Sequence, residues 1–338
     1  MQRCIKLAER GLGKTFPNPL VGSVIVFEGN IIGEGWHKKA GSPHAEANAI
    51  CNVQNKEFLS KSTLYVSLEP CNHFGKTPPC SDLIIKNKIP RVVIASTDPN
   101  PLVSGKGIEK LKKAGCEVVI GVLKKEADFL NRRFFTFHKL KRPYIILKWA
   151  QTKNNFIAPI QKKTDNPEVY WITNNHSKQR VHIWRSEEAA ILVGVQTVIN
   201  DNPELTTREW TGNNPLRIVI DPNRRTPKDS KIFQDNIPTL FFTKDNIKLL
   251  PNKKKQNIVS PFCLENILKE CYKLKIQSII IEGGLRTLES FIKENLWDEA
   301  RVFKTDKKLK TGITAPEFKK ISNQKETYEG DELNIYFN

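Results

Sequence analysis

The spacing of one histidine and two cysteines constrains the fold of this chain more than any other feature. His44 opens the run His44-Ala45-Glu46, and Cys71 and Cys80 follow further along the chain. One imidazole and two thiolates are three of the four ligands that a zinc ion takes, and a catalytic zinc keeps its fourth position open for water. The carboxylate of Glu46 then remains as a proton carrier for that water. The segments that carry these side chains must therefore be neighbours in the fold.

Each of these residues also has an ordinary interpretation. A single histidine is more often a hydrogen-bonded core residue, and a single cysteine is more often a buried thiol. The combination with Glu46, and with Pro70 directly before Cys71, favours a zinc site instead. We therefore predict His44, Cys71 and Cys80 as zinc ligands and Glu46 as the catalytic acid and base.

Strands and helices alternate along the first part of the chain. We expect strands at 21–27, 31–35, 63–68, 91–96 and 117–121. We expect helices at 5–10, from His44 onward, and at 81–87, 108–114 and 124–137. His44 and Glu46 then lie in the first turn of one helix, Cys71 follows a strand, and Cys80 opens another helix. This alternation predicts a three-layer α/β domain.

A short basic connector with a proline, residues 138–143, separates this part from a second alternating region. We therefore predict two domains, 1–143 and 144–338. In the second we expect strands at 144–150, 189–194, 216–221, 239–243 and 278–282, and helices at 177–186, 264–274 and 285–293. We expect a surface loop at 244–260. Gly283-Gly284 lies between a strand and a helix, where it could bring the backbone close to a phosphate or simply form a tight turn.

Composition narrows the class of protein. The formal net charge of +18 raises the question of nucleic-acid binding, but the lysines are scattered along the chain, which favours solvated faces. We find no apolar run long enough for a membrane span and no secretory signal. Five of the seven cysteines have apolar or helical neighbours, which predicts small buried hydrophobes and a reducing, cytoplasmic location: Cys4, Cys51, Cys116, Cys263 and Cys271.

The run from Leu68 to Cys80, in which eight residues separate the two cysteines, closely resembles one known family. So do Pro17 to Gly22, His37 with Gly41, and Asp98 to Pro101. These motifs resemble the deaminase half of the bifunctional riboflavin-biosynthesis deaminase/reductases. The resemblance implies a cytidine-deaminase-like domain and four residues in contact with substrate: Asn18, His37, Lys76 and Asn100.

The second half is similar to the reductase half of the same family in Lys148-Trp149-Ala150, Trp171-Ile172-Thr173, 194–197 and 201–208. This similarity implies a dihydrofolate-reductase-like α/β fold that uses NADPH. Carried over residue by residue, it implies that NADP contacts Gln151, Trp171, Thr197, Asp201 and Gly284. It implies that substrate contacts Arg185, Leu205, Arg208 and Glu282.

The second half also departs from the family pattern. Asn154-Asn155 replaces the usual Asp-Gly, Val169 replaces a common serine, and the segment after Asp298-Glu299 lacks the usual ending.

The predicted function follows from the resemblance. It is zinc-dependent deamination of 2,5-diamino-6-ribosylamino-4(3H)-pyrimidinone 5′-phosphate, followed by NADPH reduction of the ribosyl group to ribityl. The expected partner is this phosphorylated pyrimidine, with no nucleic acid and no membrane, and a homo-oligomer is left open. Two alternatives remain: a nucleic-acid deaminase, and a non-catalytic zinc-stabilised module with His73 as fourth ligand.

Overall fold

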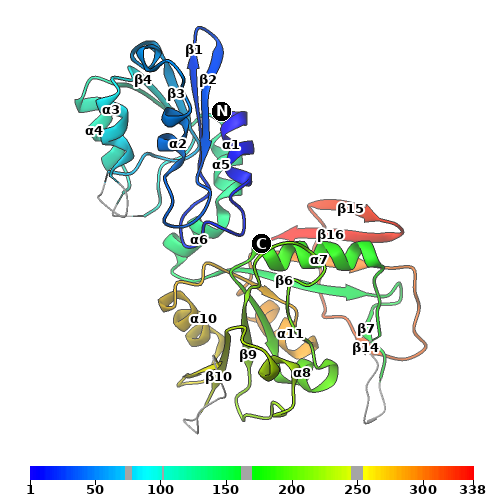
Figure 1. Cartoon of the computed structure of the whole chain (residues 1–338). Coiled ribbons are helices and arrows are strands. Elements are labelled where there is room, and N and C mark those ends of the chain that lie inside the picture. Colours follow the sequence, from blue (N-terminus) through cyan, green and yellow to red (C-terminus); the bar gives the residue numbers. More distant parts are fainter. Residues whose placement is uncertain (73–77, 101–102, 161–169, 245–253) are drawn as a thin grey trace. The chain divides into compact units, whose positions relative to one another are not determined.

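The computed structural model describes residues 1–72, 78–100, 103–160, 170–244 and 254–338 (Figure 1). The chain divides into two compact units, Met1–Lys141 (unit 1) and Arg142–Asn338 (unit 2). Three residues that the sequence singled out lie outside the described residues: His73, Lys76 and Val169. Among the described residues, no helix has the length and apolar character that crossing a bilayer requires.

The described residues of unit 1 form a five-stranded sheet in the order β2-β1-β3-β4-β5. Its strands are β1 (Gly22–Phe27), β2 (Asn30–Trp36), β3 (Thr63–Val66), β4 (Arg91–Ile94) and β5 (Glu117–Ile120). β1 runs antiparallel to β2 and β3, whereas β3, β4 and β5 are parallel. The helical elements are α1 (Gln2–Glu9), α2 (Ala45–Cys51), η1 (Lys56–Lys61), α3 (Cys80–Lys86), α4 (Lys106–Lys113), α5 (Lys124–Leu130) and α6 (Arg132–Leu140).

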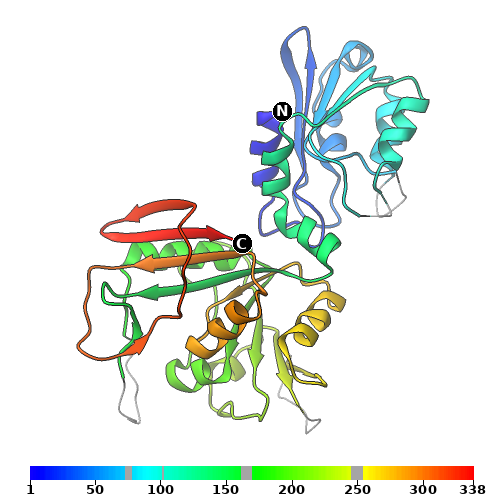
Figure 2. The ribbon, with the colours of Figure 1, turned by 180° about the vertical axis from the view of Figure 1, so that it is seen from behind.

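Alternating side chains on β1 separate two cores. Val24 packs with Cys4 and Leu7 of α1, whereas Ile25 packs with Ala49 of α2 and with residues of α3 and α4. Figures 1 and 2 show α1 and α5 on one face of the sheet and α2, α3 and α4 on the other. The predicted three-layer α/β architecture is therefore confirmed.

Two glycines of β2 bring α2 directly against the sheet. A Cβ on Gly35 would lie 2.4 Å from the nitrogen of Ala49, and a Cβ on Gly33 would lie 2.5 Å from the oxygen of Ala49. Any side chain at either position would push the helix away. Because His44 precedes α2, this contact sets the height of the histidine above the sheet.

The main sheet in the described part of unit 2 has nine strands in the order β11-β10-β9-β8-β12-β6-β13-β16-β15. Its strands are β6 (Tyr144–Gln151), β8 (Ala190–Gly194), β9 (Leu216–Ile220), β10 (Thr239–Thr243), β11 (Lys254–Ile258), β12 (Ser278–Ile281), β13 (Glu299–Lys304), β15 (Gln324–Tyr328) and β16 (Asp331–Phe337). In this order, each pair of neighbouring strands from β11 to β13 is parallel. β16 pairs antiparallel with β13, and β15 pairs antiparallel with β16. A separate pair joins β7 (Phe156–Ala158) to β14 (Ile313–Thr314).

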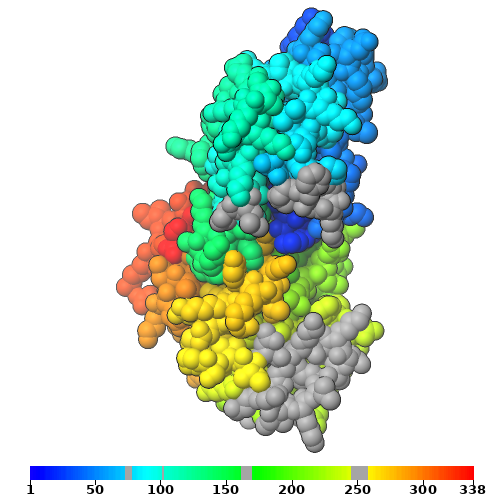
Figure 3. All heavy atoms as spheres, turned by 90° about the vertical axis from the view of Figure 1, so that its left-hand side faces the viewer, coloured from blue at the N-terminus to red at the C-terminus, as the bar shows by residue number. Residues whose placement is uncertain are grey.

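Helices cover both faces of this sheet. They are α7 (Asn175–Glu187), α8 (Val195–Asp201), α9 (Lys231–Gln234), α10 (Leu264–Lys273) and α11 (Leu285–Lys293). Val181 of α7 and Val198 of α8 pack on one face, with Ile146 of β6. Ile267 of α10 and Leu288 of α11 pack on the other. Figure 3 shows α10 (yellow) at the surface of unit 2, so this helix buries only its inner side.

Several expectations are wrong. The helix predicted at 124–137 is two helices, α5 and α6, that meet at Asn131. The buried Asn131 side chain accepts a hydrogen bond from the N–H of Leu20 and donates one to its C=O, each at 2.8 Å. These two bonds favour a break at Asn131 over one continuous helix. Of the predicted loop 244–260, residues 245–253 lie outside the described residues, and Lys254–Ile258 form β11 instead. Cys51, expected to be buried, is exposed. The sequence also gave no sign of α8, β13, β15 and β16.

Candidate active sites

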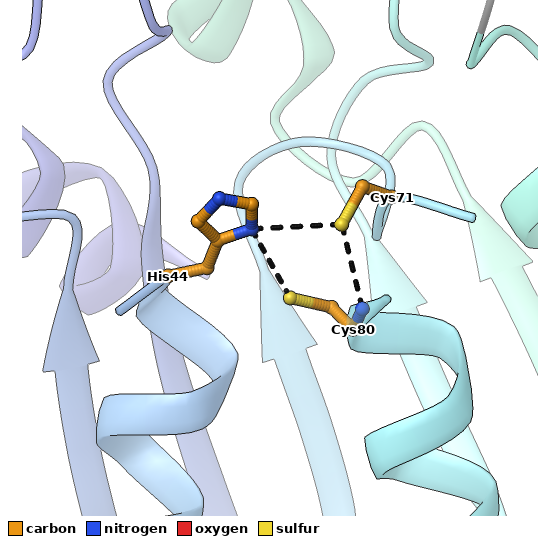
Figure 4. Close-up of side chains that lie close together, drawn as sticks. All are labelled: His44, Cys71 and Cys80. Carbon is orange, nitrogen blue, oxygen red and sulfur yellow. Dashed lines mark hydrogen bonds between the residues drawn. The ribbon is translucent and has the colours of Figure 1, made fainter. Parts of the chain in front are cut away.

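The structure brings the three predicted zinc ligands together. His44 is the residue before α2, Cys71 follows β3, and Cys80 is the first residue of α3. The Nδ1 atom of His44 lies 3.5 Å from Sγ of Cys71 and 3.3 Å from Sγ of Cys80 (Figure 4). All three ligand atoms lie within 4.8 Å of one another. Ligands of one tetrahedral zinc ion stand about 3.5–3.8 Å apart, so this set fits a single ion.

The surroundings of Cys71 favour the thiolate that zinc requires. Its Sγ accepts a hydrogen bond from the backbone N–H of Cys80 at 3.4 Å. Hydrogen bonding from the Cys80 side chain, together with that from His44, lowers the pKa of Cys71 to about 4. The hydrogen bond to Cys71 and burial raise the pKa of Cys80, so one of the two sulfurs is ready as a thiolate and the other must lose its proton when the ion binds.

Glu46 lies in the first turn of α2 and is only 3% exposed. Burial and then the charge of Cys71 raise the pKa of Glu46 to about 7, and its carboxylate is within hydrogen-bonding reach of the Cys80 side chain. The carboxylate is therefore turned toward the point where the ligands meet. A carboxyl group with a pKa near neutrality can both accept and return a proton, as general acid–base catalysis requires.

Two predicted substrate residues lie beside this centre. The ring of the buried His37 is 5.4 Å from the ring of His44, edge to face. His37 Nδ1 contacts the carbonyl of Pro43 at 3.3 Å, and a carbonyl only accepts, so Nδ1 donates. His37 Nε2 then accepts a hydrogen bond of 3.0 Å from the amide nitrogen of Asn18. Burial lowers the pKa of His37, which keeps the ring neutral.

Asn100 lies in the connection from β4 to α4. Its backbone N–H donates a hydrogen bond of 2.7 Å to the carboxylate of Asp98. Burial raises the pKa of Asp98 to about 6.

In unit 2, the predicted substrate residues Arg185 and Glu282 form a buried pair. Arg185 donates from Nε and Nη2 to the two carboxylate oxygens of Glu282, at 2.9 and 2.8 Å, and from Nη1 to the carbonyl of Thr206 at 3.1 Å. Lys148 lies 3.7 Å from the same carboxylate. Burial opposes ionisation of Glu282, but the charges of Arg185 and Lys148 prevail and lower its pKa to about 2.

The other predicted substrate residues of unit 2, Leu205 and Arg208, lie on the loop that contains Thr206. Leu205 is buried and has a φ of 57°. It precedes Thr206, whose carbonyl binds Arg185. Arg208 lies two residues further, with its Nε 4.0 Å from Glu209. This loop therefore places Leu205 and Arg208 near the Arg185–Glu282 pair.

Two further residues at this site carried no predicted role. Lys148 belongs to the motif Lys148-Trp149-Ala150, and its ammonium lies 3.7 Å from the carboxylate of Glu282. His182 is 3% exposed, one helical turn before Arg185, and its Nδ1 has no hydrogen-bond partner among the described residues. Burial and the charges of Arg185 and Arg208 lower the pKa of His182 to about 4. His182 lies three residues before Arg185 on α7 and therefore on the same face of the helix. This spacing is the signal in the sequence that could have indicated it.

Three of the five predicted cofactor residues follow or end parallel strands of the main sheet. Thr197 follows β8 and Gly284 follows β12, and the backbone N–H of Gly284 donates to Oγ1 of Thr197 at 3.0 Å. Gln151 ends the neighbouring β6. The carboxyl edge of a parallel sheet is where α/β proteins bind dinucleotides.

Two other predicted cofactor residues are less enclosed. Trp171 is 47% exposed; Lys178 lies over its ring at 4.0 Å, and Lys307 donates to its carbonyl at 2.7 Å. Asp201 is the last residue of α8 and is exposed.

A His-Cys-Cys metal set with a buried glutamate, on a three-layer α/β unit, defines a zinc-dependent deaminase, and unit 2 adds an α/β domain of the reductase type. Residues 1–96 match the family described as cytidine and deoxycytidylate deaminase zinc-binding region, and residues 143–306 match the RibD C-terminal domain. The chain belongs to the RibD family of riboflavin biosynthesis proteins. Both the resemblance and the predicted fold class are confirmed.

Individual relatives cover nearly the whole chain. The riboflavin biosynthesis protein RibD of Aquifex aeolicus is 43% identical to this chain, and the match covers 100% of this chain and 97% of the relative. RibD of Escherichia coli is 35% identical over 91% of this chain and 87% of its own. A diaminohydroxyphosphoribosylaminopyrimidine deaminase/5-amino-6-(5-phosphoribosylamino)uracil reductase of Thermotoga maritima superposes with a TM-score of 0.89, at 36% identity, over 99% of this chain and 96% of that one.

Proposed function

We propose that this chain deaminates 2,5-diamino-6-ribosylamino-4(3H)-pyrimidinone 5′-phosphate and then reduces the ribosyl group of the product to ribityl. As a RibD family member, it is a bifunctional enzyme of riboflavin biosynthesis with deaminase and reductase activities, and its two domains fit Zn²⁺ and NADPH. We assign the deaminase to residues 1–143 and the reductase to 144–338. The observation that carries the proposal is the meeting of His44, Cys71 and Cys80 beside the buried Glu46.

In the deaminase, this chain's residues bind the metal and move protons. Bound zinc would activate a water molecule for attack on the ring carbon that carries the amine. Glu46 would take a proton from that water, deliver a proton to the ring nitrogen, and assist departure of ammonia. Asn18 and the neutral His37, already oriented by their mutual hydrogen bond, would bind the polar edge of the substrate.

In the reductase, charged residues hold the phosphorylated substrate and the sheet edge holds the cofactor. Lys148, Arg185 and Glu282 together carry one net positive charge in a buried cluster, which suits an anionic ligand. NADPH would lie along the edge marked by Gly284 and Thr197 and supply the hydride to the sugar carbon.

Other predicted properties are part of the same proposal. We propose that the substrate is a small molecule rather than a nucleic acid, although the net charge is +18. All seven cysteines are free of disulfide bonds, which favours a reducing, cytoplasmic location. A mobility-shift assay with RNA at physiological salt tests the first point, since a nucleic-acid deaminase would bind tightly and lose affinity steeply with added salt. Sedimentation tests for a homo-oligomer.

The decisive experiment incubates the zinc-loaded protein with the diaminopyrimidine ribosyl phosphate, with and without NADPH. We expect ammonia release in both cases and a loss of nicotinamide absorbance only after deamination has begun. Ammonia release without NADPH oxidation would confine the proposal to the first activity. The absence of both ammonia release and NADPH oxidation would refute the proposal.

A further inference from the structure

Glu69 lies between β3 and Cys71, and among the described residues of unit 1 its carboxylate accepts hydrogen bonds from backbone N–H groups. The residue is 4% exposed. Its Oε2 accepts the N–H of Asp98 at 3.3 Å and of Gly105 at 3.0 Å. Its Oε1 accepts the N–H of Gly107 at 3.1 Å and of Ile108 at 3.3 Å. One buried carboxylate therefore binds both ends of the connection from β4 to α4.

The first turn of α4 lies in direct contact with Pro70, the residue before Cys71. A Cβ on Gly107 would lie 2.0 Å from the carbonyl oxygen of Pro70, so only glycine allows the first turn of α4 to touch the residue before Cys71. Asn72 adds a longer contact of 3.4 Å from its side-chain nitrogen to the carbonyl of Lys106. Glu69 also satisfies N–H groups of that first turn, which have no partner inside the helix.

The connection that Glu69 holds carries Asn100. Asp98 is bound to Glu69 through its backbone N–H, and the Asp98 carboxylate in turn accepts the N–H of Asn100 at 2.7 Å. This chain of contacts links Glu69, two residues from Cys71, to a residue proposed to bind the substrate. Removing an acceptor from a buried N–H leaves that donor unpaired, and the connection must then move to find another partner.

We propose that Glu69 is a positioning residue of the deaminase: it holds the backbone at Asp98, Gly105, Gly107 and Ile108, and through Asp98 it sets the position of Asn100, a proposed substrate contact. Glu69 is not one of the three metal ligands, and the hydrogen bonds that its carboxylate accepts within the described part of unit 1 come from backbone N–H groups. Its loss therefore weakens substrate binding while the zinc ligands and Glu46 stay in place. This inference rests on the proposed deaminase function.

The test is Glu69→Gln, which keeps the shape of the side chain but replaces one acceptor oxygen by an NH₂ group that faces N–H donors. The matched control is Glu109→Gln, on the same α4 but exposed and paired with Lys113. We expect KM for the diaminopyrimidine ribosyl phosphate to rise about tenfold or more and kcat to change less than about threefold. Zinc content, and reduction of separately supplied deaminated substrate, should match the wild type.

Backbone amide hydrogen exchange supplies a readout independent of activity. The N–H groups of Asp98, Gly105, Gly107 and Ile108 should exchange faster in Glu69→Gln than in the wild type and in Glu109→Gln. Should Glu69→Gln not fold, Glu69→Asp keeps the charge but draws the carboxylate back from the four N–H groups, and it carries the same expectations.

The possible results separate cleanly. An unchanged KM with unchanged exchange overturns the positioning role, and so does loss of zinc, which would make Glu69 a support of the metal ligands. Wild-type protein that releases no ammonia contradicts the proposed function instead, and the exchange measurement then still decides whether Glu69 holds the connection.

Discussion

Arg185 binds Glu282 in a bidentate pair, with two hydrogen bonds of 2.9 and 2.8 Å inside unit 2. The side chains are 12% and 9% exposed, so water screens this pair little. Because Lys148 shares the same carboxylate, the glutamate stays ionised and the cluster keeps a positive charge. The pair aligns the guanidinium, and Lys148 leaves the cluster with one net positive charge, which we propose serves an anionic ligand.

Replacing Arg185 by lysine should damage the reductase selectively. Lysine keeps the charge but cannot form the planar fork that meets both oxygens of Glu282. We expect Arg185→Lys to lower kcat/KM for NADPH-dependent reduction about 10²-fold. Ammonia release should be unchanged, and Arg91→Lys, an exposed arginine of β4, should affect neither activity. Full reductase activity in Arg185→Lys would contradict the assigned role.

His182 should make the stability of unit 2 depend on pH. Its pKa falls from 6.5 to about 4 on folding, because burial and nearby arginines disfavour the charged ring. Below pH ~6.5 the unfolded chain binds a proton that the folded chain does not, so stability falls as the pH drops toward ~4, by up to about 3 kcal/mol. Urea unfolding followed by tryptophan fluorescence measures this, since five of the six tryptophans lie in unit 2. His182→Gln should show a flatter profile between these pH values; an equally steep one would refute the assignment.

Asn131 should stabilise unit 1 through its two bonds to Leu20. Asn131→Ala leaves a buried N–H and a buried C=O unpaired, which costs about 2–4 kcal/mol. Scanning calorimetry should show a lower transition temperature for unit 1 and an unchanged one for unit 2. A shift equivalent to less than about 0.5 kcal/mol would mean that the helix break at this residue has another cause.

Cys80 should be required for metal binding. Cys80→Ser removes one of three thiolate or imidazole ligands, so the purified protein should contain much less zinc than the wild type. Cys51→Ser is the matched control, because this cysteine is exposed on α2 and lies outside the ligand set. Elemental analysis distinguishes the two variants, and equal zinc in both would remove Cys80 from the site.

The metal centre could be predicted because its parts are local in the sequence. His44 and Glu46 share one helical turn, and Cys71 and Cys80 sit at a strand end and a helix start, positions that short patterns reveal. Glu69 gave no such signal. Its partners are backbone groups of residues 98 to 108, which no side-chain pattern reports. Lys148 was likewise hidden, since only the folded sheet places it opposite Glu282.

The strands near the carboxyl end escaped prediction for a physical reason. β13 carries Glu299 and Arg301, which read as surface charges but neutralise each other at 2.6 Å inside the unit. The departure at Asn155 is also explained by the structure. Its φ of 64° is one that glycine adopts freely and asparagine tolerates, and its side chain accepts a hydrogen bond of 2.8 Å from Gln151. Asparagine can therefore occupy this position, where glycine is usual, without strain.

The central claim is tested most directly by measuring zinc content and ammonia release together in Glu46→Gln. The glutamine fills the same buried space but cannot carry a proton. We predict wild-type zinc content with ammonia release lowered about 10³-fold or more. Ammonia release near the wild-type rate in the zinc-loaded variant would contradict the account.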